Sequence, residues 1–134
     1  FSFLEENLIP SYMVDIYPLS HRGGKAGHYH KEKKEVFCSP GNRLVLFVTD
    51  KEKNREIVDL DARTPKDIKN MEEFYFPVVY IPAGISHLVY NPNNNLVQLL
   101  VLSQMSAREA NARDTFEFDA VGGDLEEILK VLKI

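Results

Sequence analysis

Two short segments of the sequence carry side chains that can bind a metal ion. His28 and His30 are separated by one residue, and Glu35 follows five positions after His30. Residues two apart on a β-strand point to the same face, so both imidazoles can aim at one point. A turn over residues 31–34 can bring the Glu35 carboxylate back beside them. Two histidines and a carboxylate suit zinc, iron, manganese or nickel.

The second segment runs from Pro82 to Asn91 and contains His87. Pro82, Ala83 and Gly84 predict a tight turn, and His87 lies at the start of the strand that follows. In an antiparallel barrel, this arrangement can place His87 opposite the first histidine pair as a fourth ligand. A single His-x-His pair is weak evidence for a metal site, and the joint occurrence of both segments makes the evidence stronger.

Short β-like runs separated by turn residues must position these side chains. The apolar run 43–49 and the alternating run 55–60 predict a hairpin across the polar turn 50–54. Further strands are expected at 12–19, 28–30, 35–38, 76–81, 87–91 and 96–103, with Pro18 ending the first of them. Thr64 and Pro65 can begin a short helix in the polar connection that follows the hairpin. Many short strands with regular turns predict a jelly-roll barrel or sandwich.

The last residues have a different pattern. Asp124 can cap a helix over about residues 124–133. The helix would have one apolar face, formed by Leu125, Ile128, Leu129 and Leu132. We expect this face to pack on the barrel or on a second subunit.

Composition bounds the class of protein. A chain of 134 residues fits one domain, 1–134, with a barrel over about 12–120. The net charge of −4 argues against a general nucleic-acid binder. There is no apolar run near the ~20 residues that cross a membrane. The single cysteine, Cys38, cannot form an internal disulfide, so we expect a cytoplasmic protein without membrane or nucleic-acid partners.

Together the two segments resemble the two motifs of the cupin superfamily, G-x5-H-x-H-x3-4-E-x6-G and G-x5-P-x-G-x2-H-x3-N. The matching residues are His28, His30, Glu35 and Gly41 in the first motif and Pro82, Gly84, His87 and Asn91 in the second. Gly41 comes one residue early, and Arg22 and Phe76 stand where the opening glycines would fall. The resemblance implies an all-β cupin jelly-roll β-barrel with a short C-terminal α-helix. It also implies that one divalent metal ion is bound by His28, His30, Glu35 and His87.

The stretch 25–31 is similar to the entry strand of nucleotide-sugar cupins. These include dTDP-4-dehydrorhamnose 3,5-epimerase-like proteins, dTDP-sugar 3,4-ketoisomerases and the cupin domains of capsular-polysaccharide epimerases. Lys25 stands where those families carry a basic residue, and Arg22 is nearby, so both are predicted to hold a phosphate of the substrate. Asn91 has the strand parity of His87 and is predicted to line the substrate site.

The resemblance implies isomerase chemistry of the epimerase or ketoisomerase type in polysaccharide biosynthesis, by proton removal next to a sugar ketone. Tyr80, expected at the mouth of the pocket, and Glu35 are the predicted catalytic residues. The ketoisomerases usually have glutamine where Glu35 stands, which favours the metal-bearing capsular type. Two alternatives remain open: a metal-dependent dioxygenase with the same ligands, and a small-molecule-binding module without catalysis. A homodimer is expected, through Val36, Phe37 and the terminal helix.

Overall fold

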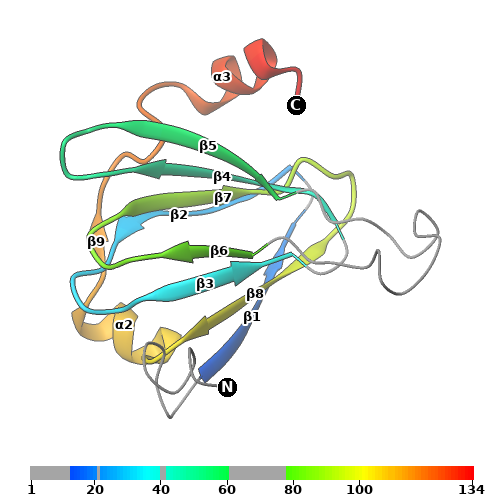
Figure 1. Cartoon of the computed structure of the whole chain (residues 1–134). Helices are drawn as coiled ribbons and strands as arrows, with labels where there is room; N and C mark the ends of the chain where they lie inside the picture. Colours follow the sequence, from blue (N-terminus) through cyan, green and yellow to red (C-terminus); the bar gives the residue numbers. More distant parts are fainter. Residues whose placement is uncertain (1–12, 21, 40–41, 61–77) are drawn as a thin grey trace.

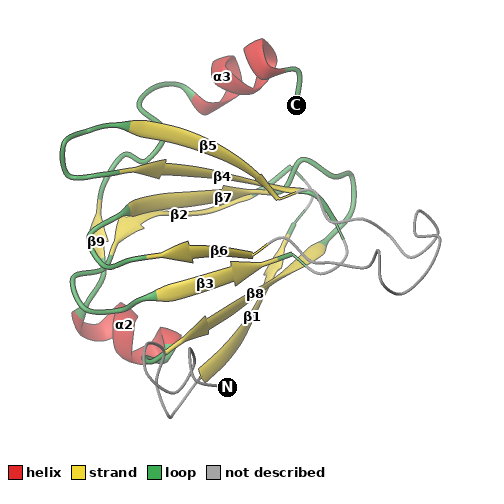
Figure 2. Cartoon of the chain, viewed as in Figure 1, coloured by secondary structure: helices red, strands yellow, loops and turns green. Residues whose placement is uncertain are grey.

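Two antiparallel sheets face each other in the computed structural model, which describes residues 13–20, 22–39, 42–60 and 78–134 (Figure 1). The strands are β1 (Met13–Leu19), β2 (Gly24–Tyr29), β3 (Glu35–Cys38), β4 (Leu44–Thr49), β5 (Arg55–Leu60), β6 (Val78–Ile81), β7 (Ser86–Tyr90), β8 (Val97–Ser103) and β9 (Phe116–Glu117). One sheet has the order β1-β8-β3-β6 and the other β5-β4-β7-β2-β9. Two short helices lie outside the sheets (Figure 2). The expected all-β jelly roll with a short C-terminal helix is confirmed.

The hydrophobic core lies between the sheets and explains the apolar pattern of the strands. Its buried members come from seven strands: Leu19, Phe37, Leu44, Leu46, Leu60, Ile81, Val89, Val97, Leu99 and Val101. Strand β4 reads as a continuous apolar run because both of its faces are covered. Leu44 and Leu46 point into this core, whereas Val45 and Phe47 belong to a second cluster under the C-terminal helix. The hairpin of β4 and β5 forms as the sequence predicts.

Helix α3 (Leu125–Leu132) packs on the outer face of the five-stranded sheet (Figure 1). Its N-cap is Asp124, whose carboxylate accepts a hydrogen bond of 3.1 Å from the backbone N–H of Glu127. Leu129 is the buried residue of the apolar face and packs with Val45, Phe47 and Tyr90. The predicted capping residue and the predicted amphipathic contact with the barrel are both confirmed.

Leu129→Ala is expected to lower the free energy of unfolding by about 2 kcal/mol, because it removes buried apolar contacts and leaves a partial cavity between the helix and the sheet. Val131 is the matched control, since it is 81% exposed on the same helix while Leu129 is 7% exposed. Val131→Ala should change stability by no more than about 0.5 kcal/mol. Urea unfolding of the three proteins, followed by circular dichroism, measures both changes. Equal effects of the two substitutions would contradict the packing described.

The structure differs from the sequence prediction in several elements. The strand expected at 28–30 is β2, which spans Gly24–Tyr29, and β9 was not predicted. Pro18 does not end the first strand but lies within it, opposite Gln98. This is possible because β1 is at the edge of its sheet and pairs with β8 on one side only. The missing backbone N–H of proline therefore interrupts no hydrogen bonds to a second neighbouring strand. Helix α2 (Ala107–Arg113), capped by Ser106, was not predicted. The helix expected at Thr64 and Pro65 lies outside the described residues. Neither helix in the described part of the chain is long and apolar enough to cross a membrane.

The outer face of the four-stranded sheet is apolar and, unlike that of the other sheet, is covered by neither helix of the described residues (Figure 1). Strand register aligns its outward residues in two rows, Val14, Leu102, Val36 and Tyr80 in one and Ile16, Leu100, Cys38 and Val78 in the other. Of the residues expected to carry a dimer, Val36 lies on this face. Phe37 instead points into the core, and α3 packs on its own barrel. The homodimer stays a prediction, which sedimentation equilibrium can test.

Candidate metal centre

Three strands bring the predicted metal ligands to one point inside the barrel. His28 lies on β2, His30 directly follows this strand, Glu35 begins β3 and His87 lies on β7. One ring nitrogen from each of the three histidines lies within 4.8 Å of the other two. The Oε1 atom of Glu35 is 3.2 Å from Nε2 of both His30 and His87. Side chains far apart in the sequence therefore converge, as the two motifs together predict.

Two glycines give the backbone the shape that this convergence needs. The register between β2 and β7 shifts between Ala26 and His28, and Gly27 in this bulge has φ +112°, a conformation that favours glycine. The bulge sets His28 directly opposite His87 in the ladder. In the turn before β7, Gly84 has φ +89° and its N–H donates a 2.6 Å hydrogen bond to the carbonyl of His30. That bond ties the two ligand-bearing segments together.

Backbone carbonyls fix the orientation of two imidazoles. Nδ1 of His30 lies 2.5 Å from the carbonyl oxygen of Asp114, and Nδ1 of His87 lies 3.0 Å from that of Ile85. A carbonyl only accepts, so each Nδ1 carries a proton and donates it. In the neutral imidazole, the lone pair is then on Nε2, the atom that faces Glu35. This is the usual arrangement behind a metal-binding histidine.

The atoms that face the centre of the cluster have no hydrogen-bond partner outside the cluster. Nε2 of His30, Oε1 of Glu35 and Nε2 of His87 are buried, and within the described part of the chain they approach only one another, with each nitrogen 3.2 Å from the Glu35 oxygen. Buried polar atoms without partners are costly and need an explanation. A cation at the point they share would satisfy all three at once. The donor set, with three imidazoles and one carboxylate, therefore fits a divalent metal ion.

Protonation at neutral pH also suits metal binding at His28 and Glu35. Burial, together with the nearby His87 and His30, lowers the pKa of His28 to about 4, so this imidazole is neutral. Burial alone would raise the pKa of Glu35, but its contacts with His30 and His87 outweigh burial and hold it below its usual value. The pKa of His30 is raised: burial alone would lower it, but the contacts with Glu35 and the Asp114 carbonyl outweigh burial. Protons therefore compete with a metal ion mainly at His30.

Lys33 belongs to this site, although its place in a charged turn does not predict such a role. The charged segment 31–34 reads as a solvated turn, and three of its residues are indeed exposed. Lys33 is not, because it is only 3% exposed and its Nζ lies 3.3 Å from Oε2 of Glu35. Glu35 thus has one oxygen directed at the histidines and the other paired with an ammonium group.

Asp114 holds the segment between His30 and Glu35 in place. Its carboxylate accepts hydrogen bonds from the backbone N–H groups of Lys31 at 2.8 Å, Glu32 at 3.0 Å and Lys33 at 2.8 Å. These three bonds outweigh its burial, which acts in the opposite direction, and lower the pKa of Asp114. Since its carbonyl also binds His30, Asp114 positions the first ligand segment from both its side chain and its backbone. It lies more than 80 residues from this segment, so no local spacing could have identified it.

The cluster opens into a cavity of about 260 Å³. Apolar residues form much of its wall, including Phe37, Leu99 and Val101. Tyr17 and Asn111 add polar groups. Burial raises the pKa of Tyr17 to about 12, with smaller contributions from Asp15 and Glu35, so its phenol is protonated at neutral pH. The cavity can therefore offer a ligand the cluster, a hydroxyl donor and a largely apolar wall.

The other predicted site residues do not join this cluster. Tyr80 is 50% exposed and lies on the outer face of β6, because its neighbour Ile81 takes the inward position opposite Glu35. Arg22 donates to the carbonyls of Pro92 and Ile134 on a different side of the domain. The side chain of Lys25 lies outside the part of the chain that the structure describes. The predicted roles of these three side chains thus gain no support from the geometry.

Asn91 has a structural position instead of one that faces a ligand. It is fully buried, and its amide nitrogen donates to the carbonyls of Leu19, Ser20 and Asn95 at 2.9–3.1 Å. Asn91→Ala should therefore lower the free energy of unfolding by about 2 kcal/mol, because buried carbonyls lose their donor. Metal content should stay unchanged. Calorimetry and elemental analysis of the variant test both parts, and loss of metal without loss of stability would contradict this role.

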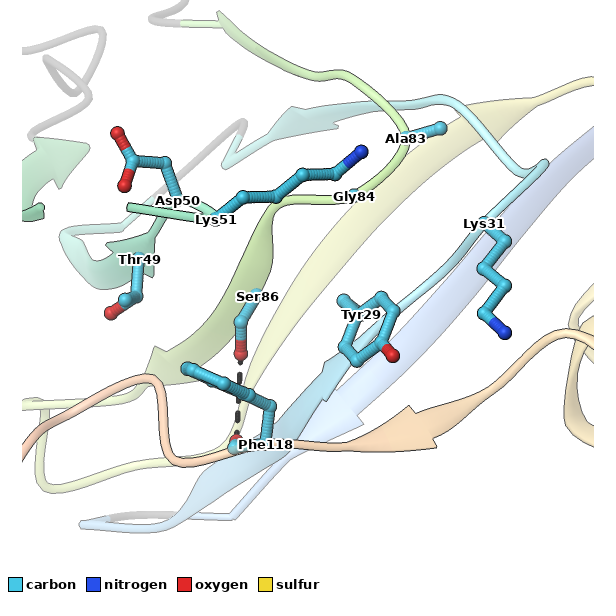
Figure 3. Close-up of a pocket in the computed structure, with 9 residues that line it drawn as sticks. All are labelled: Tyr29, Lys31, Thr49, Asp50, Lys51, Ala83, Gly84, Ser86 and Phe118. Carbon is cyan, nitrogen blue, oxygen red and sulfur yellow. Dashed lines mark hydrogen bonds between the residues drawn. The ribbon is translucent and has the colours of Figure 1, made fainter. Parts of the chain in front are cut away.

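A second hollow lies behind the cluster, on the outer side of the sheet. Strand alternation predicts that Tyr29, between the two histidines, points outward, and it does. Figure 3 shows Tyr29 in a pocket of about 540 Å³, with Lys31 and Lys51 on different sides and Phe118 below it. Ser86, the neighbour of His87, donates a 3.4 Å hydrogen bond to the Phe118 carbonyl. This pocket contains none of the four clustered side chains.

No protein-family model matches the sequence, and no curated protein matches it either. Among solved structures, the capsular polysaccharide assembling protein CapF from Staphylococcus aureus is similar over 80% of this chain, with a TM-score of 0.62 and 19% identity. The match covers 28% of the CapF chain, so this chain spans less than a third of that protein.

Two further similar structures have different described activities. The 3,4-ketoisomerase QdtA from Thermoanaerobacterium thermosaccharolyticum, solved as a double mutant with TDP, has a TM-score of 0.52 at 14% identity. That match covers 76% of this chain and 64% of QdtA. Peruvianin-I, a cysteine peptidase from Thevetia peruviana latex, has a TM-score of 0.54 at 9% identity, over 69% of this chain and 49% of its own. These likenesses show that the chain shares its all-β fold with these proteins, and a fold alone does not define an activity.

Proposed function

We propose that this domain binds one divalent metal ion through His28, His30, Glu35 and His87 and acts on a nucleotide-activated sugar. The observation that carries the metal site is the set of buried atoms of His30, Glu35 and His87 that face one point and have no hydrogen-bond partner outside the cluster. The fold that the domain shares with CapF and with QdtA bound to TDP supports the substrate class. The reaction would be of the isomerase type, with a proton removed next to a sugar ketone.

The cavity has room for part of such a substrate. Ligand sites for whole drug-sized molecules are about 300–1,000 Å³, and this cavity is about 260 Å³. One sugar ring would occupy it, and the nucleotide would lie outside the barrel. The apolar wall of Phe37, Leu99 and Val101 would exclude water from the reacting carbons.

The side chains of the cavity divide the chemistry between them. A bound divalent ion supplies Lewis acidity to a carbonyl oxygen. Tyr17 is protonated at neutral pH and so can donate a hydrogen bond or a proton to a sugar oxygen, but it does not serve as a resting base. Glu35, predicted from the sequence as both ligand and catalytic group, here has both oxygens engaged, one towards the histidines and one with Lys33. Its role in this proposal is therefore that of a ligand.

Proton exchange tests the function directly. The metal-loaded protein is incubated in D₂O with TDP- and UDP-linked 4-keto sugars, and NMR follows the loss of the proton next to the ketone. We expect exchange with the wild-type protein and none with His87→Ala, and isothermal titration should show binding of TDP or UDP. Bound iron together with oxygen uptake would instead support a dioxygenase. Nucleotide-sugar binding without exchange would support a binding module.

A further inference from the structure

Lys33 is a buried ammonium group, and within the described residues it forms an ion pair with Glu35. Its side chain is 2% exposed, and Nζ lies 3.3 Å from Oε2 of Glu35. A lysine is almost never buried unless it is paired. Here the partner is a residue that the proposed function uses as a metal ligand. The same carboxylate therefore has to neutralise Lys33 and contribute to the metal centre.

The charges that line the cavity balance only while no metal ion is bound. Among its described lining residues, Glu35 has the only carboxylate and Lys33 the only ammonium group, so they cancel. Two other carboxylates, those of Asp15 and Asp114, have partners of their own. Asp15 accepts from the backbone N–H of Ala107 at 3.2 Å, and Asp114 is occupied by three N–H groups of the loop. A divalent ion at the centre would leave an excess of two positive charges in a buried space.

Uncompensated charge away from water is costly, and an anion that enters the cavity removes this cost. We infer that the ligand of this cavity presents an anionic oxygen pair, such as a carboxylate or an ionised enediol, and that Lys33 binds one of these oxygens. This inference rests on the proposed function, because the excess charge exists only with the metal bound. It makes Lys33 a residue that selects anionic over neutral ligands.

A purely structural role for Lys33 predicts a different result. If Lys33 only holds Glu35 in place, its loss should weaken metal binding. If it acts on the ligand, its loss removes a cation beside the metal centre, and metal binding should become stronger while anion binding becomes weaker. The two affinities therefore change in opposite directions only in the second case.

The test uses the cobalt(II)-loaded protein, titrated with glycolate and followed by the visible absorption of the metal. Its neutral analogue glycolamide has the same shape and is the control ligand. The wild-type protein should bind glycolate at least tenfold more tightly than glycolamide. Lys33→Met should weaken this preference clearly and bind cobalt about tenfold more tightly, as measured by chelator competition, whereas Lys33→Arg should keep the preference.

Equal affinity of the wild-type protein for glycolate and glycolamide would overturn the inference, and this measurement needs no variant to fold. Weaker cobalt binding by Lys33→Met with an unchanged anion preference would also overturn it, in favour of the structural role. Neither result affects the metal proposal, since cobalt would still be bound. Failure of the wild-type protein to bind cobalt would contradict the proposed function itself.

Discussion

Replacing His87 with alanine is expected to remove the metal ion and the stability that it provides. His87 is 1% exposed, and its Nε2 is one of the unpartnered atoms that face the centre. Wild-type protein purified without added metal should contain about one divalent ion per chain. The site exists only in the folded protein, so the free energy of metal binding also stabilises the fold. The variant should contain close to none. Elemental analysis of both proteins measures this difference.

The same change should appear in thermal stability. A ligand that is present at 1,000 times its dissociation constant stabilises the folded state by about 4 kcal/mol. A chelator should therefore lower the melting temperature of the wild-type protein and leave that of His87→Ala unchanged. Tyr80→Phe is the control, because Tyr80 lies half exposed on the outer face and should keep both metal and stability. A His87→Ala protein with a full complement of metal would refute the centre.

Local pattern was enough to predict most of the strands and the residues that converge in the cluster. The hairpin of β4 and β5 follows from an apolar run, a polar turn and an alternating run, all within 18 residues. The position of His28 and His30 on one side follows from the two-residue period of a strand, which also turns Tyr29 outward. Such features need no knowledge of the remote chain. This is why the convergence of these side chains could be predicted from two short segments.

Features that depend on remote partners could not be predicted. Lys33 is buried because its loop is held by Asp114, and the spacing of residues 31–34 contains no sign of this contact. Tyr80 was expected at the pocket mouth because it precedes the turn at Pro82. Neither strand by itself defines the register of β6 against β3. In the structure Ile81 is opposite Glu35, and Tyr80 consequently points away. Register and burial are set by the whole sheet.

Asp114→Ala is expected to lower the free energy of unfolding by about 3 kcal/mol and to weaken metal binding by about 10- to 100-fold. The substitution removes the acceptor for the N–H groups of Lys31, Glu32 and Lys33. Asp119 is the control, since its carboxylate accepts from two backbone N–H groups in the same way but is exposed. Asp119→Ala should have a small effect on stability and none on metal affinity.

The pH dependence of stability distinguishes the contribution of the negative charge of Asp114 from that of the size and shape of its side chain. Its pKa lies below the ordinary value of 3.8, so in mild acid the unfolded chain takes up a proton that the folded protein does not. The stabilisation is therefore complete above pH 3.8 and is lost as the pH falls through the lower folded value. Asp114→Asn should be less stable than the wild-type protein at pH 7, and this difference should shrink below pH 3.8. Urea unfolding across this range, with the metal removed by a chelator, measures the difference. A constant difference at all pH values would show that the carboxylate charge contributes nothing to holding the loop.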